Sequence, residues 1–192
     1  MHTVVYDAQG HALQDARGLS ASAALLAQYG VEAGQIDFEP DADASQHDEI
    51  AALHRRFGIR SNDRVTVRPG DPAWPALRAK FLGEHTHADL ELRIFVDGCG
   101  LFHVSLPGQS LAVLCEAGDW ISVPAGVAHR FDGGRAAAFD ALRLFTQPNG
   151  WEAHFTGAGA PTLPLLDDFV AWAALPVGHA EADVGTDARL NA

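Results

Sequence analysis

The stretch HTHADLE, residues 85–91, decides the fold, because it places three potential metal ligands within seven residues. In a strand, the side chains of residues i and i+2 point to the same face, so His85 and His87 can reach one ion. Glu91 lies about 13 Å beyond His87 along an extended chain, too far for metal–ligand bonds of about 2 Å. The chain is therefore expected to turn at residues 88–90 and to bring Glu91 back on the next strand.

A second stretch, GDWISVPAGVAHRF at residues 118–131, offers a fourth ligand. Gly and Asp at its start favour a turn, WISV reads as a strand, and the Pro-Ala-Gly break places His129 at the start of the next strand. Three imidazoles and one carboxylate suit Fe(II), Ni(II), Mn(II) or Co(II) in an octahedral site. Four protein ligands would leave two positions open for a bidentate substrate.

The spacing of these two stretches resembles the two motifs of the cupin superfamily. In a chain with ten histidines, one His-x-His pair alone would be unremarkable. The resemblance rests on two blocks of fixed positions. The first is HxHxxxE followed by six residues and then Gly98, and the second is made of Gly118, Pro124, Gly126 and His129.

Short apolar runs continue outward from the first stretch, broken by Gly, Pro, Asp or Asn at intervals of about ten residues. They are LRIFV, GLFHVSL, LAVLCEA, DWISVP and AAAFDALRLF. This pattern predicts a mainly β chain with a cupin-type, jelly-roll-like antiparallel barrel and the N-terminal helices packed outside it. We expect one cupin domain over residues 1–165, in which residues 1–84 form a mixed α/β part and residues 85–157 form the metal-binding barrel core.

Several elements are expected outside the barrel core. Residues 3–7 read as a strand, and residues 20–29, 45–57 and 72–82 read as helices. Ser45 is a suitable cap for the second helix, and Asp71-Pro72 a suitable start for the third. Residues 166–192 are expected to hold a short helix, DDFVAWAAL, and a disordered tail.

The composition excludes several classes of function. The formal net charge is −12, with 25 acidic against 13 basic residues, and Lys80 is the only lysine, so binding to nucleic acid is not expected. The absence of an 18-residue apolar run and of a signal-peptide pattern predicts a cytoplasmic protein without a membrane span. Cys99 and Cys115 form no CxxC pair and are expected to be buried thiols.

Longer segments narrow the resemblance to one family. KFLGEHTHADLELRIFVDGCGLFHV, GDWISVPAGVAHRF and LRLFTQPNGWEAHFTG resemble the metal segments, the last strand and the following loop of the bacterial acireductone dioxygenases. The resemblance covers residues 70–157 well and the N-terminal part in layout only.

This resemblance implies a role in methionine salvage and a single Fe(II) or Ni(II) ion per chain. The substrates would be O2 and the acireductone 1,2-dihydroxy-3-keto-5-methylthiopentene. With iron the family gives 4-methylthio-2-oxobutanoate and formate, whereas with nickel it gives methylthiopropionate, formate and carbon monoxide. A monomer is expected.

The charge and position of residues near the ligands suggest further functions. Arg93 lies two residues after Glu91 on the same strand face, so its guanidinium can reach the cavity and stabilise the dianion of the substrate. Arg143 is either a second substrate-binding group or part of a salt bridge at the barrel rim. Two flanking positions, Glu84 and Leu90, are candidates for metal incorporation or tuning; the family commonly has an acid where Leu90 stands.

Three aromatic residues are candidates for an apolar wall around the methylthio tail, and plain core packing is an equal alternative for each: Phe81, Phe131 and Trp151. His103 is expected to be a packed or surface residue. The histidines outside these segments are expected on the surface: His2, His11, His47, His54, His154 and His179.

Two other functions remain open. A metal-dependent cupin isomerase or epimerase acting on a sugar would need more Asn, Gln and Lys on the cavity strands than this chain has. A non-catalytic cupin that binds metal or a small ligand would not need the complete ligand set together with Arg93.

Overall fold

The computed structural model describes residues 1–37, 48–160 and 162–174. Within these ranges the chain forms helices α1 (Leu19–Ala27), α2 (Asp48–Phe57), α3 (Trp74–Leu82) and α4 (Leu166–Ala173). Its strands are β1 (His2–Asp7), β2 (Ala12–Arg17), β3 (Glu32–Gln35), β4 (Ser61–Val67), β5 (His85–Thr86), β6 (Glu91–Leu106), β7 (Gln109–Glu116), β8 (Asp119–Val123), β9 (His129–Asp132), β10 (Phe139–Phe145) and β11 (His154–Phe155).

The 16-residue strand β6 joins the two halves of the barrel. Its first half pairs with β8 and β10, and its second half pairs with β7 and β9. The switch occurs near Gly98, whose φ of 72° lies in the left-handed region. A Cβ at this position would stand 2.0 Å from the carbonyl oxygen of Ala138, so only glycine allows β10 to approach so closely.

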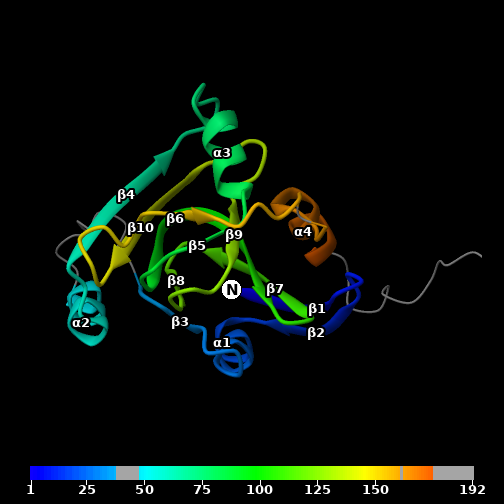
Figure 1. Ribbon diagram of the computed structural model, residues 1–192, viewed down its shortest axis with the longest axis horizontal. Coiled ribbons are helices and arrows are strands. Elements are labelled where there is room, and N and C mark those ends of the chain that lie inside the picture. Colours follow the sequence, from blue (N-terminus) through cyan, green and yellow to red (C-terminus); the bar gives the residue numbers. More distant parts are fainter. Residues whose placement is uncertain (38–47, 161, 175–192) are drawn as a thin grey trace, which may run out of the picture.

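Every strand pair is antiparallel, as the sequence predicts. One path runs β11-β5-β9-β6-β7-β1-β2, and the other strands join through β6 in the order β3-β8-β6-β10-β4. The two sheets face each other across the core, and Figure 1 shows the four helices around their outside. The expected antiparallel barrel with external helices is therefore confirmed.

The N-terminal part contributes more to the barrel than the sequence indicates. The strand expected at residues 3–7 is β1, and it pairs with β7. Two further strands from this part, β3 and β4, pair with β8 and β10. The N-terminal part therefore completes the sheets as well as supplying external helices.

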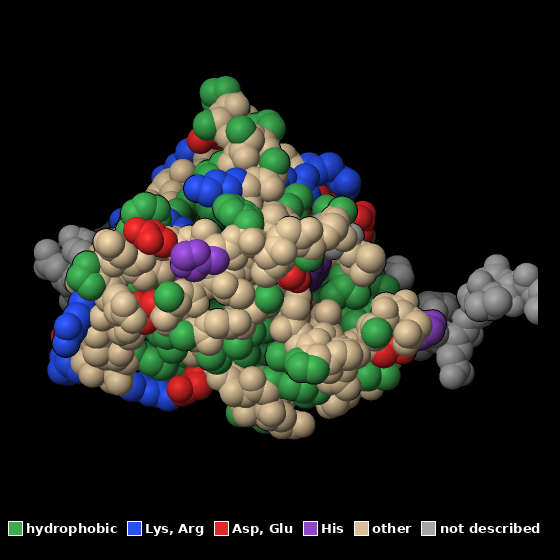
Figure 2. Space-filling model, in the orientation of Figure 1, with side chains coloured by type: hydrophobic (Ala, Val, Ile, Leu, Met, Phe, Trp, Pro, Cys, Tyr) green, Lys and Arg blue, Asp and Glu red, His purple; other side chains and the backbone are tan. Residues whose placement is uncertain are grey.

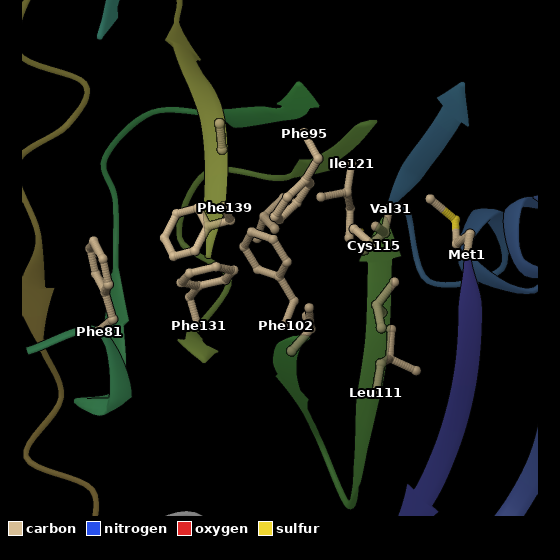
Figure 3. Packing of buried hydrophobic residues seen from close by; sticks show 14 of the residues in the cluster. Met1, Val31, Phe81, Phe95, Phe102, Leu111, Cys115, Ile121, Phe131 and Phe139 are labelled. Carbon is tan, nitrogen blue, oxygen red and sulfur yellow. The ribbon is translucent and has the colours of Figure 1, made fainter. Parts of the chain in front are cut away.

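The core between the sheets is rich in phenylalanine. Phe95, Phe102, Phe131 and Phe139 are almost fully buried and contact one another edge to face or at a tilt. Figure 3 shows these four rings gathered between the strands, with Phe81 to one side. Such ring pairs add about 0.5–1.5 kcal/mol each beyond the apolar area that they bury.

The outer faces of the central strands are covered by helices. Leu92 and Ile94 on β6 pack in one cluster with Ile50 and Leu53 of α2. At another place, Leu166 and Phe169 of α4 pack against residues of β1, β6 and β7. Because each half of β6 is buried on both faces, most of the residues in each half are apolar and do not alternate strictly with polar ones.

The helix predictions hold with small changes at the ends. The helices expected at 20–29 and 45–57 are α1 and α2, and each is followed by a glycine of positive φ, Gly30 and Gly58. The expected cap Ser45 lies outside the described residues. The third helix begins at Trp74 rather than at Pro72, because the carboxylate of Asp71 accepts the backbone N–H of Ala73 and closes a turn first.

Helix α4 is held to the barrel by polar contacts. The buried carboxylate of Asp132 accepts the backbone N–H of Leu166 at 2.9 Å and a two-pronged contact from Arg78. His103 is buried and contacts the carbonyl oxygen of Pro164. The surface prediction was wrong for His2, which is buried against Trp172 and lies 2.5 Å from the carboxylate of Asp15.

On the face drawn in Figure 2, acidic and basic side chains are scattered rather than gathered into one extended patch. None of the helices in the described ranges is long and apolar enough to span a membrane. Cys99 and Cys115 are free thiols; Cys115 is fully buried as expected, whereas Cys99 is only half-buried.

Candidate metal centre

The four predicted ligands come together at one end of the barrel. His85 on β5 lies directly opposite His129 on β9. The chain turns at residues 88–90 as expected, and Glu91 then opens β6. One ligand atom from each of His85, His87, Glu91 and His129 lies within 4.8 Å of the other three, and all four residues are buried. These four residues are called the metal centre below.

Backbone carbonyl groups fix the tautomer of each histidine. The Nδ1 atoms of His85, His87 and His129 lie 2.8–2.9 Å from the carbonyl oxygens of Gly83, Glu152 and Val127, respectively. A carbonyl oxygen only accepts, so each Nδ1 must carry the proton. Each Nε2 is then left with a lone pair directed to the middle of the cluster, which is how histidine ligands are commonly oriented in metal sites.

The carboxylate of Glu91 has two different environments. Oε1 accepts a hydrogen bond from Arg93 at 2.6 Å. Oε2 lies 3.0 Å from Nε2 of His87 and 3.3 Å from Nε2 of His129. Burial would raise the pKa of Glu91, but the charge of Arg93 and the contacts with the two histidines outweigh it and lower the pKa well below its usual value. Glu91 is therefore an anion at neutral pH, as a metal ligand must be.

The pKa values of two of the histidine ligands are shifted in opposite directions. Burial lowers the pKa of His85 to about 4, so His85 is neutral at pH 7. Burial would also lower the pKa of His87, but the hydrogen bond and charge of Glu91 raise it. Nε2 of His87 is buried and makes no well-directed hydrogen bond. This buried and unpartnered nitrogen beside an anionic carboxylate fits a bound divalent cation.

Arg93 lies behind Glu91 within a group of aromatic rings. Its guanidinium carbon is 4.5 Å from the ring centre of Phe131 and 5.1 Å from that of Phe102. Nε and Nη1 are buried without a hydrogen-bond partner among the described residues. Burial lowers the pKa of Arg93, and Glu91 opposes that effect; a guanidinium stays charged in either case. The centre therefore carries a fixed positive charge next to its anionic ligand.

A cavity of about 800 Å³ opens onto the metal centre. His85 and His87 line it, whereas the other two ligands lie deeper. Its walls come from β4, α3, β10 and the segment 148–155, which includes Trp151 and Phe155 with about half of each residue exposed. The cavity combines this apolar and aromatic surface with a few charged groups near its opening.

The structure separates the five candidates for substrate contact. Phe81, Arg143 and Trp151 line the cavity. Arg93 and Phe131 do not line it; Phe131 is only 2% exposed and packs in the core beneath Arg93. Of the two alternatives for Phe131, its position therefore matches core packing and not the apolar wall of the cavity.

The two flanking candidates, Glu84 and Leu90, do not belong to the cluster of ligand atoms. The carboxylate of Glu84 accepts hydrogen bonds from the hydroxyl groups of Ser105 and Thr156, each at 2.7 Å. This ties the residue before His85 to β6 and to the segment after β11. Leu90 is half-buried and packs against the apolar cluster beneath α2.

Asp89 is a functional candidate that the sequence interpretation missed. It is buried in the turn between His87 and Glu91, and it accepts hydrogen bonds from the backbone N–H groups of Thr146 and Gln147 at 2.7 and 2.8 Å. This fastens the metal turn to the segment that forms the cavity wall. An acidic residue at the middle of a three-residue turn was the available signal, since such residues commonly bond nearby backbone groups.

Comparison with known proteins supports this centre. The ARD/ARD' family matches residues 10–153. An acireductone dioxygenase of Methylococcus capsulatus is 42% identical over 161 residues, which cover 78% of this chain and 86% of that protein. One from Serratia proteamaculans is 44% identical over 166 residues, which cover 81% and 92%. A solved structure described as acireductone dioxygenase from Bacillus anthracis with a cadmium ion in its active centre matches with a TM-score of 0.68 and 24% identity, covering 81% of this chain and 98% of that one, and supports the cupin fold.

Proposed function

This chain belongs to the ARD/ARD' family of acireductone dioxygenases, and we propose that its metal centre holds one Fe(II) or Ni(II) ion per chain. The function is the oxidative cleavage of an acireductone in methionine salvage. The proposal takes the substrate to be 1,2-dihydroxy-3-keto-5-methylthiopentene and O2 to be the oxidant. The iron form would yield 4-methylthio-2-oxobutanoate and formate, and the nickel form methylthiopropionate, formate and carbon monoxide.

His85, His87, Glu91 and His129 would hold the ion through three Nε2 atoms and Oε2 of Glu91. When bound, the ion supplies Lewis-acid chemistry and sites for the oxygens of an ene-diolate. The backbone carbonyl groups that accept from the three Nδ1 atoms keep the rings oriented. The protein therefore preorganises the ligands before the substrate arrives.

Arg93 is proposed to stabilise the substrate dianion. An ene-diol that has lost two protons would bring two negative charges next to Glu91, and a third charge of the same sign is costly in a buried place. Arg93 offsets the charge of Glu91 from 2.6 Å and has two further donor nitrogens, Nε and Nη1, without a partner among the described residues. The guanidinium therefore lowers the cost of the dianion without giving up a proton to it.

The cavity walls are proposed to take the methylthio tail. Phe81, Leu77 and Trp151 offer apolar surface near the two ligands that line the cavity. Covering this tail and the reacting carbons excludes water from an electron-rich intermediate, which limits side reactions. The head of the substrate would then lie toward His85 and His87.

The observation that carries this proposal is the closed set of four buried ligand atoms beside a charged Arg93. The test is to strip the purified protein of metal, reload it with Fe(II), and measure O2 uptake with acireductone. One O2 consumed per acireductone, with formate and the keto acid as products, is the expected result. A reloaded protein that consumes no O2 above the metal-free control would refute the proposal.

The same experiment separates the two other functions. An isomerase or epimerase would convert a sugar without O2, so conversion of a sugar under argon by a reloaded protein that leaves acireductone unoxidised would support that class. A non-catalytic binding protein would bind metal but leave the rate of acireductone oxidation at that of the blank. We also propose a monomeric, cytoplasmic protein, and sedimentation at several concentrations tests the first of these statements.

A further inference from the structure

Two guanidinium groups lie next to each other at the metal end of the barrel. Arg93 on β6 and Arg143 on β10 are direct partners across the two strands. Arg93 is bonded to Glu91 and does not line the cavity, whereas Arg143 does line it, with 17% of its side chain exposed. Of these two guanidinium groups, Arg143 is the one that a substrate in the cavity can touch.

Asp63 fixes the orientation of Arg143. It lies on β4 directly opposite Arg143, and its two carboxylate oxygens accept hydrogen bonds from Nε and Nη2 of Arg143 at 2.8 and 2.5 Å. A two-pronged contact of this kind fixes the plane of a guanidinium as well as its distance. Among the described residues, both hydrogen bonds of Arg143 go to Asp63, so Nη1 is not used by either prong.

We propose that Asp63 is a positioning residue that holds Arg143 against the cavity so that Arg143 donates a hydrogen bond to an oxygen of the bound acireductone. This inference rests on the proposed function and deepens it. The strands of the pair lie side by side in Figure 1, and both residues line the cavity. The two alternatives for Arg143 are then compatible. Its Nε and Nη2 form the salt bridge with Asp63, and its Nη1 is left for the substrate.

Asp63 could affect substrate binding either by screening the charge of Arg143 or by positioning its guanidinium. Asp63 and Arg143 together carry no net charge, so the pair cannot attract an anionic substrate by charge alone. If Asp63 only screened Arg143, its removal would expose a full positive charge and strengthen the binding of an anion. If Asp63 positions Arg143, its removal frees the guanidinium and weakens binding. The two explanations therefore predict KM changes of opposite sign.

The experiment compares Asp63→Asn with the unaltered protein, both loaded with Fe(II). We expect KM for acireductone to rise about tenfold, the usual size of an effect from one charge-assisted hydrogen bond, while kcat falls less than threefold. Anaerobic titration with acireductone, which prevents turnover, should show that the dissociation constant also rises about tenfold. Metal content should be unchanged, because Asp63 is not a ligand.

The chain offers a matched control on the opposite face of the same strands. Arg64 on β4 donates through Nε and Nη2 to the carboxylate of Asp140 on β10 at 2.7 and 2.6 Å. Neither residue lines the cavity. Asp140→Asn therefore removes the same kind of contact between the same strands, and it should leave KM within about twofold of the original value even if it lowers thermal stability.

A second substitution tests whether Asp63 acts through Arg143. In an Arg143→Gln background, Asp63→Asn should raise KM no further, because the group that Asp63 orients is gone. A lower KM in Asp63→Asn, an unchanged KM, or an equal further rise in the Arg143→Gln background would each overturn the inference. If the unaltered protein does not oxidise acireductone at all, the proposed function fails instead, and the two failures are distinguishable.

Discussion

The metal centre and the cavity wall lie next to each other but are built in different ways. The four ligands come from 45 residues of chain and are buried. Backbone carbonyl groups hold the rings of the three histidines among them. The wall is assembled from β4, α3, β10 and residues 148–155, and Trp151 and Phe155 in it are about half exposed. A closely held centre and a partly open wall imply that metal binding and substrate selection can be altered separately.

The largest effect is expected from removing a ligand. His85→Ala, His87→Ala, Glu91→Ala or His129→Ala should each lower metal affinity by more than about a hundredfold, because each loses a direct bond to the ion. Activity with acireductone should fall with the metal content. Metal analysis after dialysis against a weak chelator, with Asp97→Asn at an exposed position of β6 as the control, measures this difference. Full occupancy and activity in any one variant would remove that residue from the centre.

Substitution of Arg93 tests whether this residue acts on the substrate or only supports the metal ligand Glu91. Arg93→Ala should keep most of the metal but lower kcat/KM by about 10²–10³-fold, because the dianion loses its fixed counter-charge. Arg93→Lys should restore only part of this loss, since an ammonium group does not replace the planar guanidinium. Parallel metal analysis and steady-state kinetics separate the roles, and a loss of metal equal to the loss of activity would show that Arg93 serves Glu91 alone.

Substitution of Phe131, in the core, and of Trp151, in the cavity wall, should affect the free energy of unfolding very differently. Phe131→Ala should lower the free energy of unfolding by about 3–5 kcal/mol, because it leaves a cavity in a packed aromatic cluster. Trp151→Ala should change that free energy by less than about 0.5 kcal/mol and instead raise KM a few-fold. Denaturant unfolding of both variants, together with KM for Trp151→Ala, checks this, and equal destabilisation by the two would contradict the distinction.

The sequence predicts the centre better than the wall for a physical reason. The ligands follow from short spacings and from turns, which are local. Alternation along a strand shows that Phe131 points inward but not how deep it lies, so it could not separate the core from the cavity. The relation between Asp63 and Arg143 joins residues 80 positions apart, and only the pairing of β4 with β10 reveals it.

The strands that the sequence does not reveal share one feature. Within the described part of the chain, each of β2, β3, β4 and β11 pairs with a single strand and so lies at a sheet edge. Most of their residues are not buried. An edge strand buries little apolar surface and leaves a weak pattern. The central strands, buried on both faces, were recognisable from their apolar runs, and so was the barrel.

A last effect, seen only as the pH falls, concerns His103, which belongs to neither region but precedes the strand partner of His129 on β6. Burial lowers its pKa in the folded protein to about 4, from an ordinary value of 6.5. The unfolded chain therefore binds the extra proton more readily, and stability should be lost as the pH falls from about 6.5 toward 4, by at most about 3 kcal/mol. His103→Gln keeps a donor for the carbonyl group of Pro164 without this titration. Unfolding across pH 4–7 should show a shallower decline for the variant, and identical pH profiles would contradict the prediction.

The central claim is that one set of four ligands holds either ion, and that the identity of the ion decides the products. The most direct measurement is to strip the protein, reload it separately with Fe(II) and Ni(II), supply acireductone and O2, and assay the gas phase for carbon monoxide. We predict carbon monoxide from the nickel form alone, with formate from both. Carbon monoxide from the iron form, or none from an active nickel form, would contradict the account.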